Sequence, residues 1–310
     1  MTAAKSSAGT RELKTFAWQG IRLTIPSDWE LVSTHGNWDA GFVALADSSA
    51  TRLQVKWEQP RGEAVPAEVV ASYIKKLTKD AKRDKTDIKV NRQLKLASLK
   101  DKEIECYEWE AADSGTGMVS RCETCGRMAH VLVTGQRGES LHNLSRTVFG
   151  SLRDHPEDGL LAWDFFDLRF NVPDKMRLAR QDLKTGCIRM LFRQKSGELE
   201  VVRVSLARVL LAKKSLAEWL CEFYAPELKR HKTEISECSL KAHPALRMAA
   251  RPWLITDPAR LIGRRRETRI ACWHCEKSNR LFVVRHQGRP EGKEILEKTL
   301  ESVECCQSRA

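Results

Sequence analysis

Ile21-Arg-Leu-Thr-Ile-Pro26 alternates apolar and polar residues and ends at a proline. Such alternation indicates a half-buried strand, and proline ends the strand because it has no N–H to give to a ladder. The same pattern returns 147 positions later as Leu168-Arg-Phe-Asn-Val-Pro173. Further segments recur in the same order at offsets of 145 to 151, as far as Ser151 and Ser302 near the ends of two closing helical stretches. The sequence therefore predicts an internal duplication.

Each predicted copy passes through strands, a helix, more strands and a final helix. The apolar residues of 69–77 and of 216–224 recur at helical spacing, and alternating runs flank both stretches. The predicted fold class is α+β, with two repeated domains that each hold an antiparallel β-sheet packed with helices. The predicted boundaries are a flexible N-terminal tail at 1–11, a first α+β repeat at 12–152, a linker at 153–160, a second α+β repeat at 161–304 and a C-terminal tail at 305–310.

The opening of each copy carries a resemblance. An aromatic residue and a turn precede the alternating strand, which continues as Pro-x-x-aromatic over Ile21–Trp29, and Leu168–Met176 follows the pattern except that Met176 stands where the aromatic residue belongs. This arrangement resembles the start of PsbP-like domains, a superfamily that includes the extrinsic photosystem II protein and the Ran-binding release factor. The resemblance implies a binding or accessory domain without a shared catalytic site, and it assigns no functional residue to this chain.

Composition limits the class of protein. A chain of 310 residues with 42% hydrophobic residues is long enough for two packed domains. No apolar run approaches the ~20 residues that span a bilayer, and the first ten residues contain no apolar signal segment. The 10 cysteines are therefore expected to be reduced thiols in a cytoplasmic protein, where Cys-x-x-Cys points to metal or redox chemistry.

Two Cys-x-x-Cys pairs lie between strand-like runs, Cys122 with Cys125 and Cys272 with Cys275. We expect each pair to form a tight hairpin, and Gly126 suits the first one because glycine lets the chain turn back. Four thiolates are a ligand set of structural zinc, so the sequence predicts one shared zinc site that joins the two repeats. Three alternatives stay open: cysteines that are small hydrophobes in a copied hairpin, a redox pair, and separate metal sites to which His130 or His274 contributes.

The other cysteines give weaker signals. The sequence predicts that four of them are buried as small hydrophobes, namely Cys106, Cys187, Cys221 and Cys238. Cys305 and Cys306 are adjacent, a spacing that does not suit chelation by two cysteines, and we expect both to be exposed near the chain end.

The charge of +12, from 53 Lys and Arg against 41 Asp and Glu, would suit an anionic partner such as nucleic acid or another polyanion. The basic residues are dispersed, however, which favours solvated faces over such a partner. The candidate anion-binding residues precede the second cysteine pair: Arg264, Arg265, Arg266 and Arg269.

No motif for a phosphate-binding loop, a dinucleotide fold, a zinc protease or a nucleophile elbow occurs, and the 8 histidines have no recurring partner. We therefore expect no catalytic residues. The predicted function is that of a non-enzymatic structural or binding protein with an unidentified protein partner. The alternatives are an anion- or nucleic-acid-binding protein and a thiol-disulfide oxidoreductase.

Overall fold

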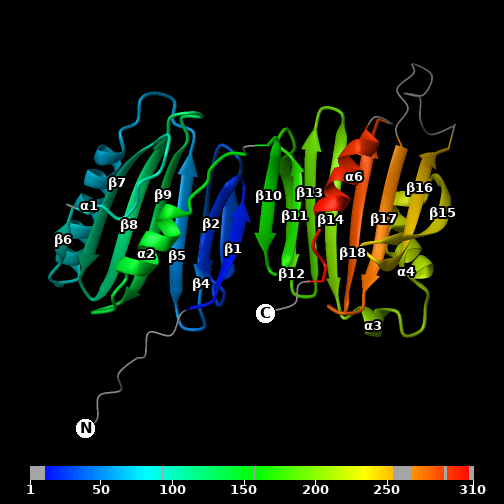
Figure 1. The fold of residues 1–310 in the computed structure, drawn as a ribbon, viewed down its shortest axis with the longest axis horizontal. Helices are drawn as coiled ribbons and strands as arrows, with labels where there is room; N and C mark the ends of the chain where they lie inside the picture. The colour runs from blue at the N-terminus through cyan, green and yellow to red at the C-terminus, as the bar shows by residue number, and fades with distance from the viewer. Residues whose placement is uncertain (1–10, 93, 157, 254–266, 290–291, 307–310) are drawn as a thin grey trace, which may run out of the picture. The chain divides into compact units, whose positions relative to one another are not determined.

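The computed structural model describes residues 11–92, 94–156, 158–253, 267–289 and 292–306. The chain divides into two compact units. Unit 1 extends to Glu157 and includes Asp164–Phe166, and unit 2 takes Asp158–Trp163 and the chain from Asp167 onward. Both units combine antiparallel strands with helices (Figure 1), so the predicted α+β class is confirmed at this level. No helix among the described residues is long and apolar enough to cross a membrane.

Unit 1 begins with an antiparallel hairpin of β1 (Leu13–Trp18) and β2 (Ile21–Pro26). An antiparallel seven-stranded sheet follows in the order β3-β4-β5-β9-β8-β7-β6. Its strands are β3 (Glu30–Gly36), β4 (Ala40–Ala46), β5 (Thr51–Glu58), β6 (Lys89–Asn91), β7 (Lys102–Glu110), β8 (Asp113–Cys122) and β9 (Met128–Gln136). Helix α1 (Pro66–Arg83) packs on β7 and β8, and α2 (His142–Gly150) packs on β2 and β8.

Strand β10 (Leu160–Phe165), whose last two residues belong to unit 1, and β11 (Leu168–Pro173) precede the second antiparallel sheet, which lies in unit 2 and has the order β12-β13-β14-β18-β17-β16-β15. Its strands are β12 (Arg177–Lys184), β13 (Cys187–Gln194), β14 (Gly197–Ser205), β15 (His231–Leu240), β16 (His243–Pro252), β17 (Glu267–Cys275) and β18 (Arg280–Gly288). The helices are α3 (Ala207–Leu210), α4 (Leu216–Phe223), α5 (Ala225–Leu228) and α6 (Lys293–Ser302). Helix α4 packs on β17, and α6 packs on β11 and β18.

The two sheets share one strand order. If β3 is matched with β12, each later strand of unit 1 has a counterpart in unit 2 at the same place in its sheet. The order agrees with the predicted duplication, which itself stays a prediction.

Turn chemistry explains the opening hairpin of each unit. Gln19 and Gly20 have φ of 52° and 84°, and Phe166 and Asp167 have φ of 48° and 56°. Two successive positive φ values match the twist of the flanking strands, as in the two-residue turns that hairpins prefer. With this turn the apolar residues of β2 are buried and Arg22 is exposed, as the alternation predicts.

Each sheet has an apolar face under its first long helix. Tyr107 and Trp109 on β7 and Leu132 on β9 pack beneath α1. In unit 2, Cys272 on β17 packs with Trp219 of α4. Because successive side chains of a strand point to opposite faces, the intervening residues face the other side of the sheet, where α2 or α6 lies (Figure 1). Helices therefore cover both faces of each sheet.

The last helix of each unit ends in the same set of contacts. The hydroxyl oxygen of Ser151 accepts a hydrogen bond from the Thr24 N–H at 2.8 Å, and that of Ser302 accepts one from the Asn171 N–H at 2.8 Å. These bonds fasten the helix end to β2 or β11, and so fix the direction of the residues that follow.

The residues after these helices remain part of the folded units. Arg153 forms a β-bridge with Arg22, and Glu304 forms one with Arg169. The expected linker at 153–160 therefore begins within unit 1, and the boundary between the units lies at Glu157. The expected C-terminal tail at 305–310 likewise begins directly after a bridged residue.

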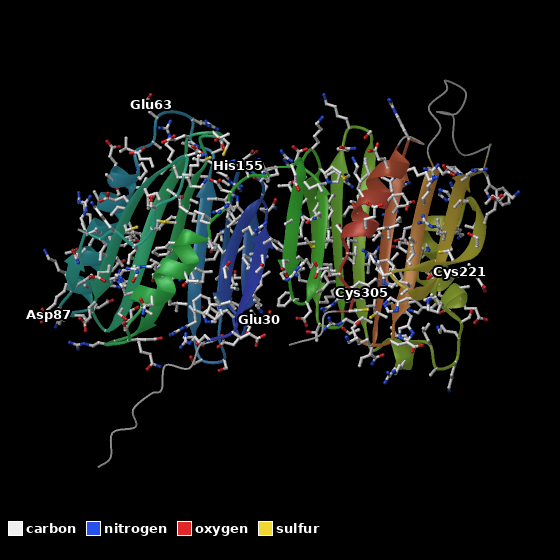
Figure 2. All side chains as sticks on the ribbon, viewed as in Figure 1. Glu30, Glu63, Asp87, His155, Cys221 and Cys305 are labelled. Atoms are coloured by element: carbon white, nitrogen blue, oxygen red, sulfur yellow. The ribbon has the colours of Figure 1, made fainter. Side chains whose placement is uncertain are left out.

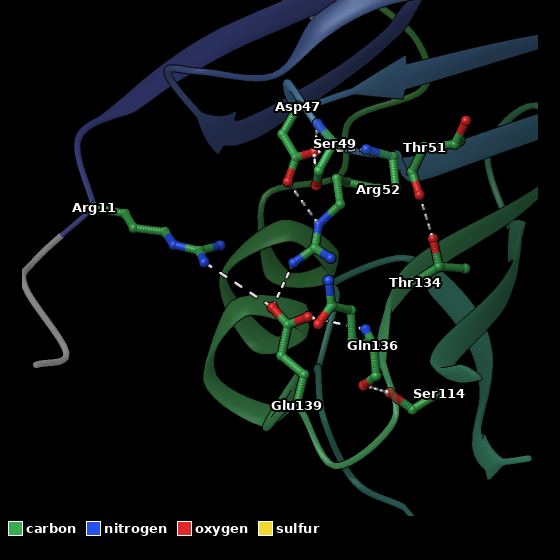
Figure 3. A network of polar contacts seen from close by, with 10 residues as sticks. Arg11, Asp47, Ser49, Thr51, Arg52, Ser114, Thr134, Gln136 and Glu139 are labelled. Carbon is green, nitrogen blue, oxygen red and sulfur yellow. Dashed lines mark hydrogen bonds and ion pairs between the residues drawn. The ribbon is translucent and has the colours of Figure 1, made fainter. Parts of the chain in front are cut away.

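A polar network holds the loop that leads to α2 (Figure 3). The buried guanidinium of Arg52 forms ion pairs with Asp47, at 3.3 Å, and with Glu139. Glu139 also accepts a hydrogen bond from the Gln136 N–H at 3.0 Å. A hydrogen bond from the Ser49 hydroxyl is the main reason that the pKa of Asp47 falls to about 2. These charges are mutually satisfied, so the network positions α2 and offers no reactive group.

Candidate metal centres

Unit 1 gathers four metal-ligating side chains at one corner of its sheet. The ligand atoms of Cys122, Cys125, Asp154 and His155 all lie within 4.8 Å of one another. The Sγ atom of Cys122 is 3.4 Å from Nδ1 of His155, which is 2.9 Å from Oδ1 of Asp154. We call this group cluster 1; Figure 2 labels His155.

The local sequence explains how the two cysteines of cluster 1 meet. Cys122 is the last residue of β8, and the chain then turns through Gly126, whose φ is 72°. The Gly126 N–H donates to the Cys122 carbonyl at 2.8 Å, which closes the turn and brings Cys125 back toward Cys122. This is the hairpin that the sequence predicts for the first pair.

Arg127 joins this turn to the rest of unit 1. Its buried guanidinium donates to the carbonyl oxygens of Asp154 at 3.1 Å, Gln19 at 2.9 Å and Trp38 at 3.1 Å. It also lies over the rings of Trp38 and Trp57, at 4.6 and 5.5 Å from their centroids. Arg127 therefore sets the position of the segment that carries Asp154.

Asp154 is 1% exposed and carries one unsatisfied oxygen. Its Oδ1 pairs with the Lys102 ammonium and contacts His155. Its Oδ2 is buried and has no hydrogen-bond partner among the described residues. A buried carboxylate oxygen without a donor is costly, and a cation beside it would remove that cost.

Unit 2 has a comparable group, which we call cluster 2. The ligand atoms of His243, Cys275, Cys305 and Cys306 lie within 4.8 Å of one another. The Sγ atom of Cys306 is 3.5 Å from that of Cys275, 3.6 Å from that of Cys305 and 2.9 Å from Nε2 of His243. Figure 2 labels Cys305.

The two clusters occupy corresponding places in the two folds. Cys122 ends β8 and Cys275 ends β17, which are matched strands. Asp154 and Cys305 each follow the residue that bridges to β2 or β11. Lys102 is the first residue of β7 in unit 1, and His243 is the first residue of the matched strand β16 in unit 2. Lys102 and His243 therefore occupy corresponding positions.

Most distances within the two clusters are close to those of a tetrahedral ion. Zinc holds thiolate sulfur at ~2.3 Å and imidazole nitrogen at ~2.0 Å, so bound sulfurs lie roughly 3.8 Å apart and a sulfur and a nitrogen roughly 3.5 Å apart. The separations are 3.5 and 3.6 Å between sulfurs in cluster 2, and 3.4 Å from sulfur to nitrogen in cluster 1. The 2.9 Å from Cys306 Sγ to His243 Nε2 is shorter than a zinc-bound pair, so these two atoms would move apart around an ion. Two Cys/His groups could thus hold a metal ion.

Cys272 differs from the expectation. The second Cys-x-x-Cys lies inside β17 and forms no hairpin, and residues three apart on a strand point to opposite faces. Cys272 accordingly lies in the apolar cluster beneath α4, and Cys275 joins cluster 2. Trp273, expected in a hairpin tip, is fully buried. Of the predicted set, Cys122 and Cys125 lie in cluster 1, Cys275 lies in cluster 2 and Cys272 lies in neither group; the shared site itself stays a prediction.

Burial keeps several of these thiols protonated in the metal-free protein. It raises the pKa of Cys125 to about 11 and also raises the pKa of Cys272 and of Cys305. At Cys275 burial also acts to raise the pKa, but hydrogen bonds with Ser278 outweigh it and the pKa is lowered. A redox-active thiol needs a lowered pKa, the opposite of the shift at Cys125 in the first Cys-x-x-Cys. The turn between β8 and β9 also lacks the helix N-terminus that lowers a thiol pKa in redox motifs.

The predicted anion-binding residues contribute little to a described site. Arg264, Arg265 and Arg266 lie outside the described residues. Arg269 is on β17, where its guanidinium pairs with Glu267 at 2.6 Å.

The two histidines that the sequence suggested as extra metal ligands lie outside both clusters. His130 Nε2 is 2.7 Å from the Tyr107 hydroxyl, and His274 lies on β17 outside both clusters.

Sequence reasoning missed the second half of each cluster. Asp154 and His155 fall in the predicted linker, and Cys305 and Cys306 in the predicted tail. The expectation that Cys305 is exposed was wrong, since it is buried, whereas Cys306 is exposed. The signal was present, because Cys305-Cys306 follows Asp154-His155 at the offset of 151 that relates Ser302 to Ser151.

No protein-family model matches the chain, and neither does any curated protein. Among solved structures, one similarity is to the WD40 domain of SCAP from fission yeast, with 6% identity over 90% of this chain and 94% of that chain. Its TM-score of 0.14 is too low to support any statement about fold or function.

Proposed function

We propose that this protein is a non-enzymatic structural or binding protein, built from two copies of one α+β domain, whose first unit holds a structural zinc ion in cluster 1. Cys122, Cys125 and His155 supply two sulfurs and a nitrogen, and Asp154 supplies an oxygen. These donors are all found in zinc sites. The ion would fasten the turn after β8 to the segment that follows α2.

The unpartnered Oδ2 of Asp154 carries this proposal. The carboxylate lies in the interior with one oxygen satisfied by Lys102 and His155 and the other left without a donor. One oxygen of this carboxylate lies within 4.8 Å of two thiol sulfurs and an imidazole nitrogen. A cation held by these groups would offset the cost of the incompletely satisfied carboxylate, and zinc is the ion that this mixture of donors favours.

The two alternative functions have less support. A thiol-disulfide oxidoreductase requires a stabilised thiolate, whereas burial raises the pKa of Cys125 to about 11. Of the four candidate anion-binding residues, Arg269 is paired with Glu267, and the other three lie outside the described residues, so no described contact supports an anion site. The closed, fully protein-derived donor set of cluster 1 likewise favours a structural role over catalysis, because a catalytic zinc keeps one position open.

Metal analysis of the full chain tests the proposal. Protein purified without chelator or metal-affinity resin is analysed for zinc per chain by mass spectrometry, as wild type and as Cys122→Ser. We expect Cys122→Ser to lose one zinc ion per chain, because a thiolate ligand is gone. Asp154→Asn should weaken binding, because the amide gives no charge to the metal.

Two further variants make the result specific. Cys221→Ser changes an exposed cysteine of α4 outside both clusters and should keep the wild-type zinc content. Cys272→Ala distinguishes cluster 1 from a site shared with Cys272. If cluster 1 binds the ion, this variant keeps its zinc content, whereas a shared site would lose its zinc ion. Equal zinc in wild type and Cys122→Ser would disprove the proposal.

A further inference from the structure

We infer that unit 2 carries a second and independent zinc site in cluster 2, with Cys275, Cys305, Cys306 and His243 as its four ligands. Three thiolates and one imidazole form a recognised donor set of closed structural zinc sites. The inference does not depend on cluster 1, since every ligand lies in unit 2.

The geometry favours metal binding over simple burial of cysteines. Three sulfurs from two separate segments converge, with Cys306 at 3.5 and 3.6 Å from the other two. A histidine from a third segment completes the group, with its Nε2 2.9 Å from the Cys306 sulfur. Cysteines that serve only as small hydrophobes need apolar neighbours. Cys306 instead contacts two sulfurs and an imidazole, and it is exposed.

The fold provides a reason for a metal at this place. After α6 the chain makes one β-bridge through Glu304, and Cys305 and Cys306 then lie against the ends of β16 and β17. The Cys275 thiol donates to the Cys305 carbonyl at 3.3 Å, a weak bond for holding a chain segment. Zinc bound by ligands from β16, β17 and this segment would join all three, and its binding free energy would add to the stability of unit 2.

The two clusters should differ in their preference for metals. Cluster 2 has three sulfurs and no carboxylate, whereas cluster 1 has two sulfurs and an oxygen donor. Soft thiolate ligands favour thiophilic ions. We therefore expect cadmium, a softer ion than zinc, to displace zinc from cluster 2 more readily than from cluster 1.

The test uses the full chain as the variant Cys122→Ser, which retains only cluster 2, and as the double variant Cys122→Ser/Cys306→Ser. Cys306 is exposed, so its replacement should leave the fold intact. Both proteins are reduced, stripped of metal and titrated with zinc under native mass spectrometry. We expect one bound zinc ion in the first protein and none in the second.

Alkylation of the thiols identifies the ligands. Zinc should protect Cys275, Cys305 and Cys306 together and leave the labelling of Cys238 on β15 unchanged. His243→Gln should weaken zinc binding by at least the roughly 10–100-fold that the loss of an outer-shell partner costs. His231→Gln, at the start of β15, is the matched control and should bind as before.

Three results would overturn the inference. The first is a Cys122→Ser chain that binds no zinc. The second is zinc that leaves the three thiols open to alkylation. The third is a disulfide between Cys306 and Cys275 or Cys305 in freshly purified protein, seen as a loss of two hydrogens, which would make the group a redox pair. A failure of cluster 1 appears separately, as unchanged zinc in Cys122→Ser relative to wild type.

Discussion

The imidazole of His130 should make the stability of unit 1 depend on pH. It lies on β9, its ring packs edge-on against Tyr73 with the centroids 4.9 Å apart, and Nε2 is 2.7 Å from the Tyr107 hydroxyl. Burial, with a smaller contribution from the charge of Lys56, lowers the pKa of His130 to about 4. The pKa of Tyr107 is raised by burial, so its hydroxyl keeps its proton and can donate to the neutral imidazole.

The magnitude follows from proton linkage. In the unfolded chain His130 takes up a proton near pH 6.5, whereas in the folded protein it does so only near pH 4. The folded state is therefore fully favoured above pH 6.5 and loses this contribution as the pH falls toward 4. The loss is about 2 kcal/mol between pH 7.5 and pH 5.0 and about 3 kcal/mol once both states are protonated.

Urea denaturation of wild type and His130→Gln at both pH values measures this loss. The variant should lose about 2 kcal/mol less than wild type between pH 7.5 and pH 5.0, because glutamine does not titrate. Taking the difference between the two proteins cancels the carboxylates and the metal ligands, which both chains share. Tyr107→Phe should keep the wild-type pH dependence, because burial is the main cause of the shift. Equal pH dependence in wild type and His130→Gln would refute a buried, neutral His130.

Four substitutions test the packing of the two units by urea denaturation. Arg127→Met leaves three carbonyl oxygens without their donor and should cost about 3–5 kcal/mol, together with weaker zinc binding by cluster 1; unaltered stability would mean that the guanidinium is not buried. Ser215→Ala removes the capping box of α4 and should lower the free energy of unfolding by about 1 kcal/mol. Unchanged stability would mean that Ser215 does not cap this helix. Gly115→Ala sets a methyl group against the Trp109 ring and should cost about 1–3 kcal/mol, whereas Gly62→Ala, with open space around it, should be close to neutral; equal effects at both sites would contradict the packing of Trp109 on β8.

The parts of the fold that follow from local patterns could be predicted from the sequence. The alternation in β2 and β11, the prolines that end them and the helical spacing of α1 and α4 are all local properties, and each gave the right kind of element. The first cysteine pair was also predictable as a turn, because Gly126 can adopt the positive φ that the turn requires.

The second cysteine pair could not be resolved in the same way. Trp273 and His274 lie between the two cysteines, and neither is a residue type that marks a turn. The local sequence therefore does not distinguish a continuous strand from a hairpin. Only the pairing of β17 with β16 as far as Trp273, and with β18 as far as Cys275, shows that the strand continues and that Cys272 and Cys275 face opposite sides. The remaining ligands depend on where the chain returns after α2 and α6, which is a tertiary property that no local pattern records.

The two clusters differ in what holds their final segments, and this difference bears on what a metal would add. In unit 1 the segment after α2 is held by direct bonds: Arg127 donates to the Asp154 carbonyl, and Lys102 pairs with the Asp154 carboxylate. In unit 2 the residue that matches Arg127 is Arg280, which pairs with Asp167 of the opening hairpin. The segment after α6 is held by the backbone bridge and the 2.9 Å ion pair between Glu304 and Arg169, and the sulfurs of Cys305 and Cys306 contact the other groups of cluster 2. Metal at cluster 1 would therefore act on a segment whose ligand Asp154 is itself fixed by two direct bonds, whereas metal at cluster 2 would fix the residues beyond the Glu304 bridge.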